Sequence, residues 1–159
     1  MSVDYSEKIL TVKDLEVQFN LRGQVLTAIR GISLDIYKGE SLAIVGESGS
    51  GKSVFTKTFM GMLDKNGKVT KGEILYNGMD LAKFSSEKDW LKIRGKEVAM
   101  VFQDPMTSLN PLKTVGKQIQ EALELHQNLH GRAARERTIE ILSDVGITEP
   151  ERRYKQYPH

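Results

Sequence analysis

The segment from Gly46 to Ser53 constrains this 159-residue chain more than any other feature. It reads GESGSGKS and fits the pattern G-x-x-x-x-G-K-S/T at every fixed position. Average composition gives a chance match in roughly one of two hundred chains of this length. The apolar run 42–45 precedes the loop, and residues at helical spacing follow it: Phe55, Phe59, Met60 and Leu63. The sequence therefore predicts a buried strand, a phosphate-binding loop and a helix, in that order.

The residue types in this loop suit the binding of an anion. Glycines at 46, 49 and 51 allow the backbone to curl so that successive N–H groups point inward, and the following helix adds partial positive charge. Lys52 carries a point charge for the terminal phosphates, and the Ser53 hydroxyl is a hard oxygen suited to Mg²⁺. We expect a nucleotide-phosphate cradle made of Gly46, Ser48, Gly49, Ser50, Gly51, Lys52 and Ser53.

The flanking segments predict an α/β fold with an antiparallel start. Apolar and polar residues alternate at two places before the loop, which is typical of strands with one buried face: Leu15, Val17 and Phe19, and then Ile32, Leu34 and Ile36. The uninterrupted apolar run 98–102 predicts a second strand buried on both faces. From Thr114 onward the apolar spacing becomes helical. We expect a phosphate-loop core in residues 1–104 and the start of a helical subdomain in 105–159.

Composition excludes several other classes of protein. The net charge of +2 offers no strong attraction for nucleic acid or an anionic membrane, and the chain has no cysteine for a disulfide or thiolate site. No apolar run reaches the roughly 18 residues of a membrane helix, so we expect a soluble polypeptide. His126 and His130 have a spacing that could hold a metal ion, but no acidic residue of the H-E-x-x-H kind lies between them. We interpret both as surface histidines.

Two motifs together resemble a known family. The segment VAMVFQDPMTSLNP at 98–111, combined with GESGSGKS, is similar to ATP-binding subunits of ATP-binding-cassette transporters, above all those of oligopeptide and dipeptide importers. The resemblance runs over nearly the whole chain, including YKQYPH at 154–159. It implies an ATPase core with an N-terminal antiparallel β subdomain and the start of a helical subdomain.

The resemblance also implies roles for individual residues. Gln103 matches the glutamine that approaches Mg²⁺ and the attacking water, so that Lys52 and Gln103 form the catalytic set, and Ser53 and Gln103 the metal set. Val54 joins the loop residues around the cofactor, which is ATP with Mg²⁺. An aromatic residue upstream of the loop stacks on adenine in this family, and Phe19 is the candidate. Arg22 is the alternative stacking group, and the pattern equally allows Phe19 to face the core.

The resemblance predicts an incomplete domain. The chain ends before the places where relatives carry a signature motif, a strand ending in Asp-Glu and a switch histidine, so this piece is expected to lack hydrolysis by itself. The implied parent is an ATPase at the cytoplasmic face of the membrane, bound peripherally to permease subunits and to a second ATP-binding subunit. It does not contact the transported solute or nucleic acid. The alternatives are a phosphate-loop kinase acting on a small molecule and a non-catalytic nucleotide-binding fragment.

Overall fold

The computed structural model describes residues 3–104 and 107–159 and separates into two compact units. One unit extends to Lys92 and the other begins at Ile93. The boundary predicted from the sequence, at 104–105, divides the chain by function and stays a prediction.

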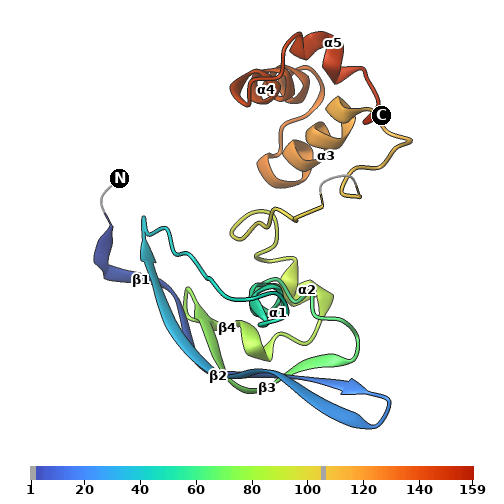
Figure 1. Ribbon diagram of the computed structural model, residues 1–159. Coiled ribbons are helices and arrows are strands. Elements are labelled where there is room, and N and C mark those ends of the chain that lie inside the picture. Colours follow the sequence, from blue (N-terminus) through green and yellow to red (C-terminus); the bar gives the residue numbers. More distant parts are fainter. Residues whose placement is uncertain (1–2, 105–106) are drawn as a thin grey trace. The chain divides into compact units, whose positions relative to one another are not determined.

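The first unit is built on a four-stranded antiparallel sheet in the order β2-β1-β3-β4 (Figure 1). The strands are β1 (Asp4–Leu21), β2 (Gln24–Lys38), β3 (Gly67–Tyr76) and β4 (Met79–Asp80). β1 pairs along its length with both β2 and β3. The predicted antiparallel start of the chain is confirmed. β3 and β4 form a hairpin at Asn77-Gly78, where both residues adopt positive φ.

A β-bulge allows β1 to bury three apolar side chains at uneven spacing. Val12, Leu15 and Val17 are all fully buried, although the step from 12 to 15 is odd and would normally place two of them on opposite faces. The register of β1 shifts between Val12 and Leu15, which restores the common face. Opposite the bulge, Gly72 has φ +92°, and a Cβ there would lie 2.4 Å from the Lys13 carbonyl oxygen. Glycine at 72 therefore makes room for the bulge.

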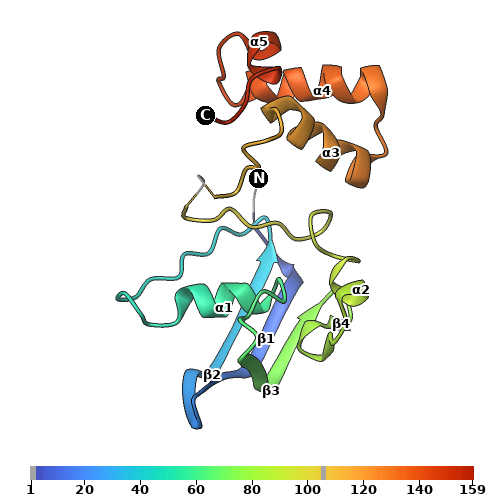
Figure 2. The same cartoon turned by 90° about the vertical axis from the view of Figure 1, so that its right-hand side faces the viewer.

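Helix α1 (Lys52–Thr58) lies on one face of this sheet, beside β2 (Figures 1 and 2). The sequence predicted a helix reaching Leu63, but α1 ends earlier because Gly61 adopts φ +59° and the Trp90 indole occupies the space beside it. Trp90 belongs to α2 (Glu87–Trp90), which follows the short 3-10 helix η1 (Leu81–Lys83). A capping box formed by Ser86 and Asp89 begins α2.

The second unit contains three helices, α3 (Val115–Gln127), α4 (Gly131–Asp144) and α5 (Pro150–Tyr154). The Tyr154 ring packs directly on Gly116, where a Cβ would lie 2.2 Å from it. The Tyr154 hydroxyl donates to Gln120 Oε1 at 2.5 Å, and the Val115 N–H donates to the Gln156 carbonyl at 2.8 Å. These contacts fix the segment around α5 to the first turns of α3. No helix in the described part of the chain is long and apolar enough to cross a membrane.

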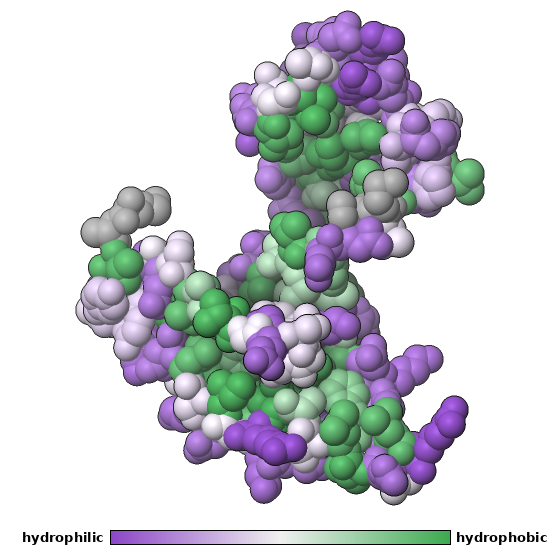
Figure 3. Space-filling model, viewed as in Figure 1, coloured by the Kyte–Doolittle hydropathy of each residue, from purple (hydrophilic) through white to green (hydrophobic). Residues whose placement is uncertain are grey.

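The two apolar runs beside the motifs are not strands, which corrects the sequence prediction. Residues 42–45 have no regular secondary structure, and Val45 is 89% exposed. In the run 98–102, Val98 forms an isolated bridge with Arg94, while Val101 is 98% exposed. A strand buried on both faces needs neighbouring strands and covering helices, and no strand within 3–104 or 107–159 pairs with either run. Apolar patches are visible on the surface of the unit that contains the sheet (Figure 3).

Candidate functional site

The loop at 46–51 connects the exposed segment after β2 to helix α1. Its backbone turns back on itself where the Ser50 N–H donates to the Glu47 carbonyl at 3.2 Å. Gly51 is the N-cap of α1 with φ +92°, and its carbonyl accepts from the Phe55 N–H at 2.8 Å. The predicted order of loop and helix is confirmed, whereas the strand expected before them is absent from the described residues.

Gly51 allows the loop to lie directly against β2. A Cβ at this position would lie 2.9 Å from the Ile29 Cδ1 atom and 3.1 Å from the Ala28 carbonyl oxygen. The end of the Ile29 side chain could move aside, but the Ala28 carbonyl belongs to the strand backbone and would have to give way slightly. The positive φ disfavours other residues as well. Two structural features therefore favour glycine at this fixed position of the motif: the positive φ of its backbone and the close approach of the loop to β2.

Lys52 begins α1, and its ammonium group bends back into the loop. Its Nζ donates to the carbonyl oxygens of Gly46 at 2.6 Å and Glu47 at 2.7 Å, and to Ser50 Oγ at 3.2 Å. A Cβ on Gly46 would lie 2.7 Å from Ser50 Oγ, so glycine at 46 leaves room for that hydroxyl. The loop thus surrounds a cationic group that can face a phosphate. Sequence reasoning did not anticipate these contacts with the loop's own carbonyls.

A cavity of about 220 Å³ lies between the loop and the sheet. Gly46, Ser50, Gly51 and Lys52 form its polar side, and its apolar side consists of Ile29, Ile32, Leu34, Ile44, Val45 and Phe55. Ile32 and Leu34 were predicted to face a buried core. They face this cavity instead, and Ile32 remains 36% exposed. The unfilled space explains why the predicted buried face of β2 is incompletely covered.

The remaining cofactor candidates of the first unit lie along the same elements. Ser53 and Val54 are in the first turn of α1, with Ser53 exposed to solvent. Phe19 lies in β1, opposite Leu26 of β2, and its half-buried ring covers Gly67 of β3. Ala28, two residues along β2 from Leu26, carries the carbonyl that touches the loop at Gly51. Phe19 and the loop at Gly51 therefore lie beside the same strand, β2. The Phe19 ring itself packs on the sheet.

Gln103 belongs to the second unit, where it is exposed. Next to it, the Asp104 carbonyl accepts from Ser108 Oγ at 3.3 Å. The structure brings the loop residues, Lys52 and Ser53 together within the first unit and assigns Gln103 to the other. Pro105 and Met106, which belong to the motif after Gln103, lie outside the described residues.

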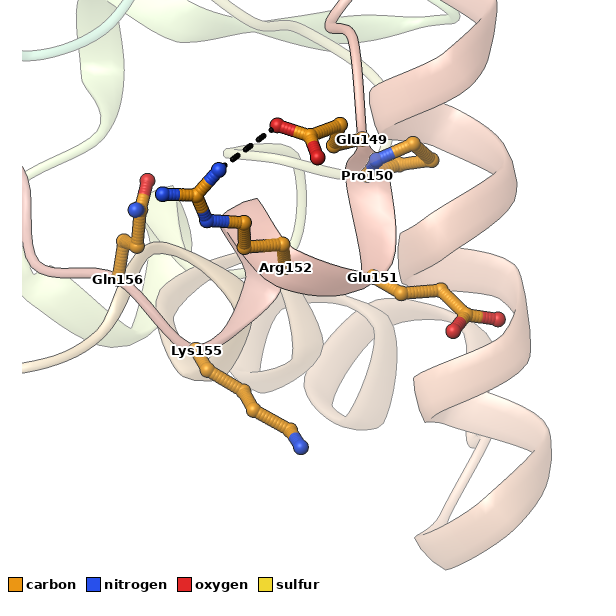
Figure 4. Close-up of a pocket in the computed structure, with 6 residues that line it drawn as sticks. All are labelled: Glu149, Pro150, Glu151, Arg152, Lys155 and Gln156. Atoms are coloured by element: carbon orange, nitrogen blue, oxygen red, sulfur yellow. Dashed lines mark hydrogen bonds and ion pairs between the residues drawn. The ribbon is translucent and has the colours of Figure 1, made fainter.

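A depression around α5 offers no comparable chemistry. It is lined by charges of both signs, and Arg152 Nη1 pairs with Glu149 Oε2 at 3.0 Å (Figure 4). Because the carboxylate neutralises the guanidinium and both are largely exposed, the depression has no concentrated field for an anion. Among the residues that the structure describes, no group of three or more His, Cys, Asp or Glu side chains is arranged to hold a metal ion. The loop is the better candidate site.

A family model and several curated proteins match most of this chain. The family model described as ABC transporter matches residues 29–159. The chain is 54% identical over 150 residues to the oligopeptide transport ATP-binding protein AmiE of Streptococcus pneumoniae, covering 94% of this chain and 42% of that protein. It is 50% identical over 154 residues to the dipeptide transport ATP-binding protein DppD of Bacillus subtilis, covering 96% and 46%. The chain thus spans less than half the length of these curated relatives.

A solved structure shares the fold. The dimeric, post-hydrolysis state of the ATP-binding cassette MJ0796, bound to ADP and Pi, superposes with a TM-score of 0.78 at 26% sequence identity. The match covers 94% of this chain and 61% of that one. The predicted fold class, an α/β ATPase cassette with an antiparallel sheet followed by helices, is confirmed.

Proposed function

This chain belongs to the ABC transporter family, and we propose on that basis that it is the N-terminal part of an ATP-binding subunit that powers peptide import. The relatives of known function named above are ATP-binding proteins of oligopeptide and dipeptide transport. Identity of 50–54% over nearly the whole chain supports a similar task for the protein that contains it.

The observation that carries this proposal is the phosphate loop closed around Lys52. Its ammonium nitrogen lies 2.6–2.7 Å from two loop carbonyl oxygens, and a Cβ on Gly46 or Gly51 would lie 2.7–2.9 Å from the nearest side-chain atom. A cation held in a backbone loop of this size fits the terminal phosphates of a nucleotide. Such a site also provides a hydroxyl for a hard cation at Ser53.

We assign the residues of this chain to the following roles. The loop residues Gly46, Ser48, Gly49, Ser50 and Gly51 hold the phosphates by backbone N–H groups, and Lys52 neutralises their charge. Ser53 and Gln103 hold Mg²⁺ by oxygen, and Gln103 orients a water molecule without titrating. Bound MgATP supplies the γ-phosphoryl group for in-line transfer to water. Val54 supports the loop from α1, and Phe19 is the proposed adenine contact.

The proposed partners follow from the same relatives. The protein would pair with a second ATP-binding subunit, as the dimeric state of the structural neighbour suggests, and would dock on permease subunits. Its proposed place is the cytoplasmic face of the membrane, attached through those subunits. The transported peptide would be bound by other subunits.

Hydrolysis and uptake by the intact transporter test this proposal. Lys52→Met should lower ATP turnover and peptide uptake by at least about 100-fold, because it removes the charge that stabilises the transferred phosphoryl group. Gln103→Ala should reduce turnover while leaving nucleotide affinity within a few-fold of the original. Lys57→Met, the same change five residues further along α1, is the matched control and should leave both rates unchanged.

Two results would contradict the proposal. If ATP turnover is unchanged in Lys52→Met, the loop takes no part in the reaction. Turnover that requires a small-molecule acceptor and yields its phosphorylated product would identify a kinase instead.

A further inference from the structure

The loop at 110–113, which follows Gln103 in the second unit, is held to α3 by one side chain. Gln118 Oε1 accepts from the Asn110 N–H at 2.8 Å, and Gln118 Nε2 donates to the Asn110 carbonyl at 3.0 Å. The same Nε2 donates to the Lys113 carbonyl at 3.1 Å. An amide side chain has one oxygen and two N–H donors, so Gln118 uses its oxygen and both donors on this loop. These bonds supply the loop with partners that a neighbouring strand would otherwise provide.

A second contact with α3 lies ahead of Gln103, where the chain turns at 93–98. The Gly95 N–H donates to the Val98 carbonyl at 2.9 Å, which closes this turn. The imidazole of His126, near the end of α3, lies against Gly95, because a Cβ at this glycine would be 2.4 Å from its Nε2 atom. The turn before Gln103 and the loop after it therefore contact the same helix.

Gln103 lies between these two contacts along the chain, in exposed surroundings. Its own side chain is exposed, and Val101 is 98% exposed. The Asp104 carbonyl accepts from Ser108 Oγ at 3.3 Å, which joins the neighbour of Gln103 to the part of the chain that Gln118 holds. An exposed side chain of this kind depends on restraints elsewhere on its backbone, and the two contacts with α3 supply them.

We propose that α3 positions Gln103 through both contacts and that Gln118 is the positioning residue. The consequence for hydrolysis rests on the proposed function, in which Gln103 holds Mg²⁺ and orients a water molecule. Without the Gln118 amide, the backbone of the loop loses three hydrogen bonds and Gln103 spends less time in its productive position. Gln118 and Lys52 belong to different units, so nucleotide binding by the phosphate loop is expected to persist.

Amide hydrogen exchange in the intact, nucleotide-free protein tests the structural half of this proposal. Gln118→Met keeps an unbranched side chain but removes the amide. The Asn110 N–H should exchange at least about tenfold faster in this variant, while the amides of α4 keep their protection. His126→Ala should accelerate exchange of the Gly95 N–H by a few-fold. Gln127→Met, the same change at the exposed end of α3, is the matched control and should alter neither amide.

ATP turnover by the intact transporter tests whether Gln118 acts through Gln103. Gln118→Met should lower kcat about tenfold and leave KM for MgATP within about twofold, because it disturbs the positioning of a group rather than the binding of the nucleotide. His126→Ala should lower kcat about threefold. Added to Gln103→Ala, Gln118→Met should lower kcat no further, because the side chain that it positions is already gone.

The two measurements decide the proposal together. Unchanged exchange at Asn110 or unchanged kcat in Gln118→Met would overturn it, and so would a loss in kcat that adds to that of Gln103→Ala. If Gln118→Met also removes the protection of α4, His126→Ala decides, and an unchanged kcat there overturns the proposal. Absence of turnover in the original transporter refutes the proposed function instead, whereas the exchange rates still decide whether α3 holds this part of the chain.

Discussion

The antiparallel sheet and the two apolar runs at 42–45 and 98–102 contain similar residues but have opposite environments. Val17 in β1 is fully buried, whereas Val45 before the phosphate loop is 89% exposed. The sheet obtains its hydrogen bonds from paired strands, with β1 bonded to both β2 and β3. The runs have no such neighbours among the described strands. Apolar composition therefore produces a strand only where a partner completes its backbone hydrogen bonds.

The largest loss in the free energy of unfolding is expected at Gly61, where the packing beside the Trp90 ring leaves no free space. Gly61→Ala would place a Cβ 2.1 Å from the Trp90 ring at a positive φ. We expect a loss of about 3 kcal/mol in the free energy of unfolding of the 159-residue polypeptide, from overpacking and backbone strain together. The control Gly23→Ala also has positive φ but nothing within 4 Å. It should cost about 1 kcal/mol. Urea unfolding measures both, and equal losses would contradict the packing around Trp90.

Val17 and Val45 are a matched pair that tests the comparison between the sheet and the apolar runs. Val17→Ala should destabilise the same polypeptide by about 2 kcal/mol, because it removes buried apolar surface. Val45→Ala should change the stability by less than about 0.5 kcal/mol, because that side chain already faces solvent. Urea midpoints at constant m-value provide the measurement. A comparable loss for Val45→Ala would mean that the run is buried in solution.

The third and smallest expected loss in the free energy of unfolding concerns the charge of Asp80 in β4. Burial raises the pKa of this carboxyl group, but hydrogen bonds from the Ile74 and Ala82 N–H groups and the ion pair with Lys83 outweigh it, so the pKa lies below its usual value. A lowered folded-state pKa stabilises the protein above the unfolded-state pKa, and this contribution disappears as the pH falls through the folded-state value.

Asp80→Asn should therefore cost about 1 kcal/mol at neutral pH. The difference between the two proteins should shrink as the pH falls below about 4. Unfolding by urea at a series of pH values measures this difference. A difference that is constant with pH would show that the charge of Asp80 does not stabilise the β3–β4 hairpin.

Local signals in the sequence predicted much of the fold. Alternation predicted β1 and β2, and two further local signals agree with the structure: Asn77-Gly78 is typical of a hairpin turn, and Ser86 with Asp89 is typical of a helix cap. All three depend on residues near one another in the chain. The two apolar runs were predicted wrongly as strands because their state depends on partners that the pattern does not specify. The early end of α1 depends on the contact between Gly61 and Trp90, which no local pattern indicates.

The candidate site was likewise only partly predictable. The motif indicated the loop and the place of Lys52 in it, because its fixed positions are set by the geometry of phosphate binding. The acceptors of the ammonium group were not predictable, since they depend on how the loop folds back toward α1. Neither was the packing of Phe19 on Gly67, which depends on the register between β1 and β3.

Calorimetric titration of MgATP into the intact, nucleotide-free protein tests the central claim, that the loop at 46–53 holds the phosphates of a nucleotide. Saturable binding is expected for the original protein and for Lys57→Met. Lys52→Met should bind at least about tenfold more weakly, because a charge-assisted hydrogen bond contributes on the order of 1.5–3 kcal/mol. Equal affinity in Lys52→Met, or no binding by the original protein while its sheet remains folded, would contradict the claim.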